Sequence, residues 1–462
     1  MKFTKTQTSS IQFNKRLFYG QVFALTLPMA LQNLINVGVT ATDVLMLGRV
    51  SEVSLSGASL GGQIQFIMTL ILMGITSGAT VLSAQYWGKR DIKAIEKILG
   101  MSLFFGVAVS LLFSIMALTI PQYLMRIFSN EQDVIAEGVK YLRIVGISYI
   151  FASVAQVYLY VMRSIEKVII ATFVYLISLM INFTVNAVLI FGLFGAPRMG
   201  VQGAAIGTLI ARIIEFTIVF VYAKYKNDII KVRFKYIFKI DKPLLRDFMV
   251  YSLPVVMNEL FWGGGTSANT AIIGHMGSAA VAANSVVQVT RQLSMVITFG
   301  IANATAIIIG KTIGEKKIAL AKAYGHQFLK MTVVLGIAGA GIILIISPIA
   351  RATLALSPQT MEYLEIMFIV MAYFAFCQAI NSTLVVGVFR AGGDTKFGLI
   401  LDVTSMWCCS ILIGFIAAFV LKLSVPVVYV ILLSDEVIKL PFTLKRYFGY
   451  KWLRDVTREE VN

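Results

Sequence analysis

The chain has 462 residues, of which 58% are hydrophobic and 14% charged, and it carries a net charge of +17. This is far more apolar side chain than one soluble core of that length needs, which excludes an ordinary soluble protein. The excess of basic residues does not indicate a nucleic-acid partner, because most of them lie in short segments beside long apolar runs.

Apolar runs of eighteen to thirty residues recur along the whole chain, and each can cross a hydrocarbon layer of roughly 30 Å at about 1.5 Å per residue. Alternating strand patterns are absent from the sequence, so we expect an all-α membrane protein. Twelve transmembrane helices are predicted at 18–47, 57–86, 98–119, 138–161, 168–193, 201–223, 248–274, 279–309, 327–349, 363–387, 396–420 and 424–443.

Most of the 40 Lys and Arg residues fall in the segments that are cytoplasmic if the N-terminus is inside. We therefore expect a multi-pass protein of a bacterial-type plasma membrane with both termini in the cytoplasm. The first apolar run is too long for a cleavable signal. The predicted organisation is a leader (1–17), an N-lobe of six spans (18–223), a basic linker on the headgroups (224–247), a C-lobe of six spans (248–443) and a tail (444–462).

The two predicted lobes repeat one another at a constant offset of 226 residues. Six spans is an even number, so both lobes enter the membrane in the same direction and are related by a pseudo-twofold axis along its normal. Such repeats are typical of transporters whose two lobes rock around a central cavity. The matched residues that set backbone shape are Pro28 with Pro254, Gly38 with Gly264, Gly48 with Gly274, Gly74 with Gly300, and Gly88 with Gly314.

Several short motifs on this frame resemble one known family. They are LTLP and ATDVLMLGR in the first span, NFTVNAVLIFG in the fifth, LP-NE-W in the seventh, FRAGGDTK after the tenth and KWLRDVT at the end. The chain resembles the multidrug and toxic compound extrusion (MATE) family over nearly its whole length. The resemblance implies a transporter, not an enzyme, which exchanges H⁺ or Na⁺ for amphipathic, often cationic organic compounds and needs no other cofactor.

The resemblance also implies candidate ion sites. In DinF-like members an acidic residue in the first span works with an Asn and a second acidic residue in the fifth, and the matching positions here are Asp43, Asn182 and Asn186. Asn186 departs from that pattern because it cannot titrate. NorM-like members use acids in the seventh and tenth spans. Glu259 lies about one turn earlier than expected, and Ala379 occupies the tenth-span position.

Counting depth along the spans gives a second set of candidates, because an ionisable residue inside a membrane usually faces a cavity or a partner. Asp43 and Asn186 share the outer half of the bilayer, so contact between them is possible. In the C-lobe we expect an acidic ion-coupling or proton-coupling cluster with one compensating Arg: Glu259, Asp402, Asp435, Glu436 and Arg291. The alternative for this cluster is a purely structural network of salt bridges.

Arg212 lies one turn from Glu215, and we expect the two charges to neutralise each other inside the N-lobe. Pro28 and Pro254 are candidate hinges for the rocking motion. The polar and aromatic residues at corresponding depth in the two lobes are candidates for the substrate cavity: Gln32, Asn33, Asn258 and Trp262.

Two alternative functions stay open. A flippase for lipid-linked precursors would need several Arg and Lys at mid-depth, where Arg212 and Arg291 are the two singled out. A membrane-embedded enzyme would need a metal or nucleophile motif, and the two His residues lie far apart in the topology, so no metal site is predicted. The expected partners are small organic molecules and the bilayer, and we expect the monomer to be the functional unit.

Overall fold

The computed structural model describes residues 14–239, 241–353 and 357–458. All regular structure in these ranges is helical, which confirms the all-α prediction. Ten of these helices are long and apolar enough to cross a membrane. The helix Lys242–His275 and the pair of helices at residues 425–448 complete the twelve expected spans.

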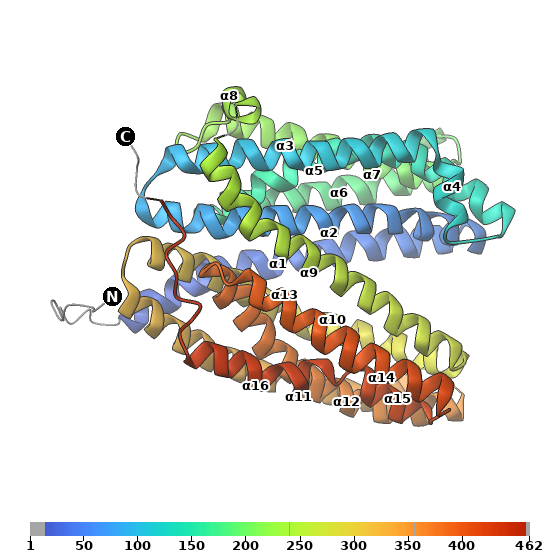
Figure 1. Cartoon of the computed structure of the whole chain (residues 1–462). Helices are drawn as coiled ribbons and strands as arrows, with labels where there is room; N and C mark the ends of the chain where they lie inside the picture. Colours follow the sequence, from blue (N-terminus) through green and yellow to red (C-terminus); the bar gives the residue numbers. More distant parts are fainter. Residues whose placement is uncertain (1–13, 240, 354–356, 459–462) are drawn as a thin grey trace.

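The first six spans form one group of helices, shown in blue to green in Figure 1. A short helix α4 (Pro121–Arg126) connects the third span to the fourth. The six spans are α1 (Lys15–Gly48), α2 (Glu52–Lys89), α3 (Ile92–Thr119), α5 (Gln132–Ser164), α6 (Ile169–Phe191) and α7 (Val201–Val221).

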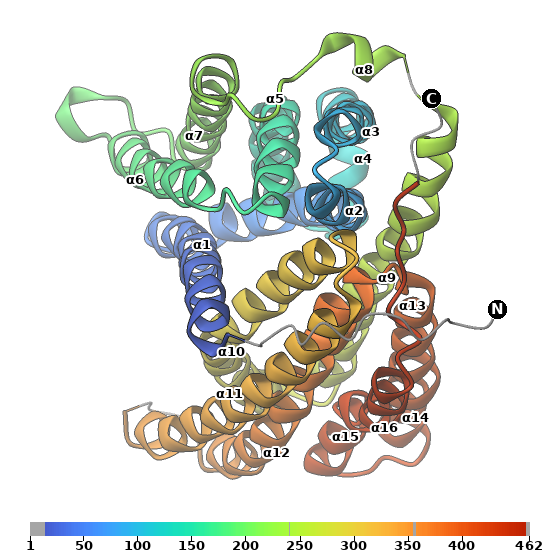
Figure 2. The ribbon, with the colours of Figure 1, turned by 90° about the vertical axis from the view of Figure 1, so that its left-hand side faces the viewer.

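The last six spans form the second group, and Figure 2 shows the two groups as separate lobes when viewed from the end that holds the termini. Helix α12 continues through a π-helical segment, Thr383–Phe389, and the eleventh span alternates between α-helical and π-helical segments along residues 395–420. The helices are α9 (Lys242–His275), α10 (Ser278–Gly314), α11 (Ile318–Thr353), α12 (Pro358–Ser382), α13 (Thr395–Val403), α14 (Leu412–Phe415), α15 (Val425–Leu432) and α16 (Asp435–Phe448).

The twelfth span is broken, whereas the sequence predicts one continuous helix over 424–443. Helix α15 ends at Leu432 and α16 begins at Asp435. Asp435 and Glu436 occupy the first turn of α16, where free backbone N–H groups and the helix dipole favour negative charge. The break therefore gives two acidic residues a stabilising place inside the membrane.

The basic linker packs on the N-lobe. Its short helix α8 (Phe234–Phe238) lies beside α3, as Figure 2 shows. Glu96 of α3 accepts a hydrogen bond from the backbone of Lys231 (3.0 Å) and pairs with Arg233 (2.6 Å). Phe234 and Phe238 remain exposed, so contact of this helix with the membrane interface stays a prediction.

The lobes meet through the glycines that the repeat matches. Gly74 of α2 packs on Val256 of α9, two residues beyond Pro254. Its counterpart Gly300 of α10 packs on α1 on both sides of Pro28, at Thr26 and Ala30. Residues that correspond in the two halves thus make corresponding contacts, as a twofold interface requires. This arrangement supports the parallel repeat.

The same reciprocity closes the end of the molecule that carries the termini. Gly88 packs on the carbonyl of Lys311, and Gly314 packs on the carbonyl of Gln85. Lys311 also forms a 2.7 Å ion pair with Glu166 of the N-lobe. At the opposite end the two groups of helices diverge (Figure 1). The structure is therefore closed at one end of the bundle.

The C-terminal segment adds a further connection at the closed end. The side chain of Gln85 in α2 donates hydrogen bonds to the carbonyls of Ala391 (2.7 Å) and Arg454 (3.1 Å). Its oxygen accepts one from the backbone N–H of Val456 (2.8 Å). The buried side-chain amide of Gln85 therefore finds its hydrogen-bond partners in the C-lobe and in the C-terminal segment.

We expect Gly88→Val to open this end, because any side chain at position 88 would overlap the backbone of Lys311. Pulsed EPR distances between spin labels at Arg90→Cys and Ala319→Cys, both exposed positions, would report the change in a cysteine-free background. The distance distribution should move to longer values. Gly62→Val in the same helix is the matched control, since nothing lies within 4 Å of Gly62. Identical distributions for the two variants would contradict the expectation.

Candidate transport site

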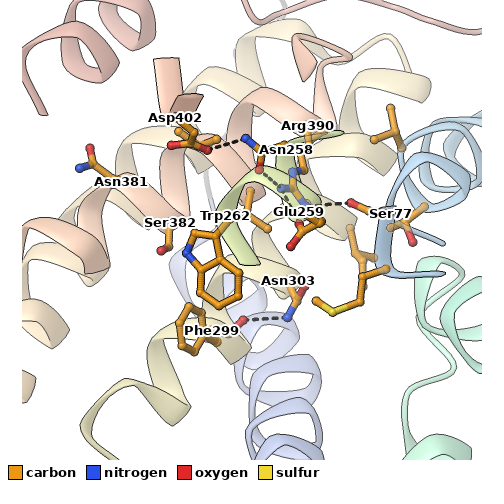
Figure 3. Close-up of a pocket in the computed structure, with 18 of the residues that line it drawn as sticks. Ser77, Asn258, Glu259, Trp262, Phe299, Asn303, Asn381, Ser382, Arg390 and Asp402 are labelled. Carbon is orange, nitrogen blue, oxygen red and sulfur yellow. Dashed lines mark hydrogen bonds and ion pairs between the residues drawn. The ribbon is translucent and has the colours of Figure 1, made fainter. Parts of the chain in front are cut away.

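A cavity of about 370 Å³ lies between the lobes and is lined by residues of both. Three of the four predicted cavity residues line it: Asn33 of α1, and Asn258 and Trp262 of α9. Figure 3 shows Trp262, Asn258 and Asp402 around this space. The wall combines apolar and aromatic surface with a few fixed polar groups, which is the composition of a small-molecule site.

The fourth predicted cavity residue, Gln32, is elsewhere, and this expectation was wrong. Its amide donates hydrogen bonds to the carbonyl of Val168 (3.1 Å) and the hydroxyl of Thr172 (2.8 Å) at the start of α6. Gln32 is buried in the N-lobe. Neighbouring positions on a helix point about 100° apart, so Asn33 can reach the cavity while Gln32 packs against α6.

On the C-lobe wall, Glu259 is paired with Arg390, which the sequence analysis did not single out. The guanidinium of Arg390 donates to Glu259 (2.9 Å), to the side-chain oxygen of Asn258 (3.4 Å) and to Ser77 of the N-lobe (3.1 Å). All of these groups line the cavity. The π-helical segment that extends α12 carries the chain to Arg390 and places the guanidinium here.

The polar network continues through Asn258 to the acidic cluster. Asn258 donates to Asp402 (2.8 Å), and Asp402 also accepts from Lys439 (3.1 Å). Lys439 in addition pairs with Glu436 (2.8 Å) and Asp435 (3.3 Å). The four predicted acids are therefore brought into one network.

Glu436 is held from a second side. The amide of Asn381 in α12 donates to its carboxylate (2.7 Å), and Thr443 donates to the oxygen of Asn381 (2.8 Å). Lys439, Glu436 and Asn381 are all buried. A buried charge cluster is stable only when its members are paired and hydrogen-bonded, and this one is.

Arg291 does not compensate this cluster, which corrects the expectation. Its guanidinium donates to the side-chain oxygens of Gln288 (2.8 Å) and Gln378 (3.1 Å). Arg390 and Lys439 supply the positive charge instead. Arg212 behaves as predicted, since one terminal nitrogen donates to both oxygens of Glu215 (2.7 and 2.8 Å) inside the N-lobe.

The predicted N-lobe site forms a network of hydrogen bonds centred on the side-chain amide of Asn186. Asn186 of α6 donates to Asp43 of α1 (2.6 Å) and to the oxygen of Asn182 (3.2 Å). Asn182 in turn faces the hydroxyl of Thr208 in α7 (3.5 Å). The side-chain oxygen of Asn186 is buried without a hydrogen-bond partner. A proton donor or a metal cation bound beside Asp43 would give this buried oxygen the partner that it lacks.

The remaining predicted positions lie inside continuous helices. Pro28 and Pro254 lie within α1 and α9 at the contacts between the lobes. Ala379, at the tenth-span position of the NorM-like pattern, is buried against Gly336 of α11. No acidic group replaces it there, so the C-lobe acids come from Asp402 and α16 instead.

Two six-helix lobes that share a charged central cavity define a multi-pass membrane transporter. The model of the MatE family matches residues 28–188 and again 254–439, and this double match begins at the two repeat-related prolines. The chain belongs to this family, which confirms the resemblance seen in the sequence.

Curated relatives and solved structures agree with this assignment. The chain is 23% identical over 94% of its length to the uncharacterized transporter YisQ of Bacillus subtilis, and covers 95% of that relative. It is 24% identical to a probable multidrug resistance protein NorM of Thermotoga maritima, over 96% of this chain and 95% of the relative. The MATE transporter VcmN of Vibrio cholerae has a similar fold, with a TM-score of 0.86, 15% identity, and 96% and 98% of the two chains covered.

Proposed function

We propose that this protein is a secondary active efflux transporter that exchanges H⁺ or Na⁺ for amphipathic, often cationic organic compounds. The observation that carries the proposal is the cavity between the lobes, which has charged groups on its wall and repeat-related contacts closing one end of the molecule. The names of its curated relatives include multidrug resistance proteins. A matched solved structure of the family, with a TM-score of 0.83, is described as outward-facing.

The closed end carries both termini, which the distribution of Lys and Arg assigns to the cytoplasm. On that orientation the structure is the state that is shut to the cytoplasm. Substrate entry requires the reciprocal glycine contacts to separate, with Pro28 and Pro254 as hinges beside them. Residues of both lobes line the cavity, and we propose that the monomer in a bacterial-type plasma membrane is the working unit.

The N-lobe site supplies the ion coupling in this proposal. The side-chain amide of Asn186 donates one hydrogen bond to Asp43 and another to Asn182, so it joins the carboxylate to the rest of the site. When Asp43 takes up a proton it becomes a donor, and Asn186 can rotate its free oxygen to accept. The same oxygens could instead ligate Na⁺. Ion and substrate then favour opposite states of the two lobes, so each displaces the other.

Reconstitution into proteoliposomes tests the proposal. A pH gradient at equal Na⁺, and a Na⁺ gradient at equal pH, are imposed separately while the fluorescence of a cationic dye reports its movement. We expect one of the two gradients to drive the dye, and an ionophore that dissipates that gradient to stop it. Protein-free liposomes are the control. If neither gradient moves the dye, this function is wrong.

The lipid-linked-precursor flippase remains the second candidate because three cations, Arg163, Arg390 and Lys439, line the cavity. Two of them are already paired with carboxylates. A polyanionic headgroup would therefore meet a single unpaired guanidinium and several acids. This balance of charge favours the exporter.

A further inference from the structure

Of the three cations that line the cavity, Arg390 and Lys439 are paired with carboxylates, whereas Arg163 has no carboxylate partner among the described residues. It lies near the C-terminal end of α5, and among the N-lobe residues that line the cavity it is the only one with a charge. In the part of the chain that the structure describes, no hydrogen bond or ion pair from Arg163 is recorded. Arg163 lies two residues beyond the predicted end of the fourth span, and its side chain is partly buried at the cavity wall. A guanidinium without a partner in such a place is available to an anionic group of a ligand.

Two tyrosines fix the plane of this guanidinium. Its central carbon lies 4.4 Å from the ring centre of Tyr160 and 5.7 Å from that of Tyr175. The Nε atom is buried without a hydrogen-bond partner, whereas the terminal nitrogens are not among the enclosed unpaired atoms. A stacked guanidinium with its terminal edge free is preorganised for the two parallel hydrogen bonds of a carboxylate.

The opposite wall has the opposite polarity. Its lining includes three carboxylates, Glu259, Asp402 and Glu436, and two cations, Arg390 and Lys439. A fourth carboxylate, Asp435, is paired with Lys439. Formal charge on the C-lobe side is therefore negative, and on the N-lobe side it is positive. Both walls also contribute apolar side chains to the lining: Met29 and Met73 from the N-lobe, and Trp262 and Phe299 from the C-lobe.

We propose that the cavity selects zwitterionic amphipaths, with a carboxylate bound by Arg163 and a cationic group turned toward the acidic C-lobe wall. This inference rests on the proposed function and narrows its substrate class. The apolar side chains of the lining hold the ring system loosely, while the charged groups of the two walls set its direction. A simple cation uses only the C-lobe end.

A matched pair of dyes tests the assignment: a rhodamine with a free carboxylate, which is zwitterionic, and its methyl ester, which is only cationic. Dye binding to the purified protein and gradient-driven dye export in proteoliposomes are both measured for wild type, Arg163→Gln and Arg163→Lys. Arg126→Gln is the matched control, because Arg126 also stacks on a tyrosine, Tyr123, but is exposed and outside the cavity.

We expect Arg163→Gln to weaken binding and raise the half-saturating concentration of the acid dye about tenfold, as loss of a charge-assisted contact implies. The ester should change less than about twofold, Arg163→Lys should be intermediate, and Arg126→Gln should match wild type. Equal losses for the two dyes, or none, would overturn the inference even if the ester is exported. If neither gradient moves a dye but acid binding still depends on Arg163, the exporter proposal fails and the anion site stands.

Discussion

Asp43→Asn is expected to abolish gradient-driven transport while leaving a folded carrier. The carboxylate accepts a hydrogen bond from Asn186, which also donates to Asn182. Asn182 in turn donates to Thr208. An amide at position 43 can neither exchange a proton nor supply an anionic ligand. Loss of a charged contact of this kind costs ~1.5–3 kcal/mol, so the driven rate should fall at least about tenfold.

Two measurements separate uncoupling from misfolding in this variant. Exchange of labelled for unlabelled dye across the membrane needs the lobes to alternate but needs no gradient, and it should persist in Asp43→Asn. Asp228→Asn, which makes the same change at an exposed position, should behave as wild type. Full gradient-driven transport by Asp43→Asn would show that the N-lobe site does not couple the ion.

The spans could be predicted from the sequence because their length is set by the bilayer and not by tertiary packing. The contact between Asp43 and Asn186 could also be predicted, since depth counted along two helices placed both residues in the outer half of the bilayer. The break before Asp435 was not predicted, although two adjacent acids in an apolar run fit the start of a helix better than its middle.

The partners of the acidic cluster were harder to predict. Depth gives height along a helix but not direction around it, so Arg291 was expected near the acids although it faces Gln288 and Gln378. The predicted tenth span ends at residue 387, so the sequence places Arg390 in the following loop. In the structure the π-helical extension of α12 carries it to the cavity. Only the three- and four-residue spacing of Lys439 from Glu436 and Asp435 was a usable signal.

The arrangement of Lys439 changes what the C-lobe acids can do. Its ammonium lies where a bound cation would otherwise sit, between Asp402, Asp435 and Glu436. A resident charge of this kind offsets the repulsion among the carboxylates and leaves less room for Na⁺. We therefore propose that the C-lobe network is a wall that faces the substrate, and that the N-lobe site, where the Asn186 side-chain oxygen has no hydrogen-bond partner, is the ion site.

Lys439→Met should be the most destabilising single change in the C-lobe. Lys439 is 4% exposed and pairs with three carboxylates at 2.8 to 3.3 Å. Removing one partner of a buried ion pair typically costs ~3–5 kcal/mol, because the remaining charges stay buried without compensation. Thermal unfolding in detergent should show a large fall in the apparent midpoint, whereas Lys330→Met on the exposed face of α11 should show almost none.

A double variant checks that the loss comes from charge and not from packing. Glu436→Gln removes one of the uncompensated carboxylates while keeping an oxygen that can accept from Asn381. Combined with Lys439→Met it should be more stable than the sum of the two single changes, since the residues interact directly. Strict additivity, or a Lys439→Met variant as stable as wild type, would show that the ammonium does not hold the acids of this wall together.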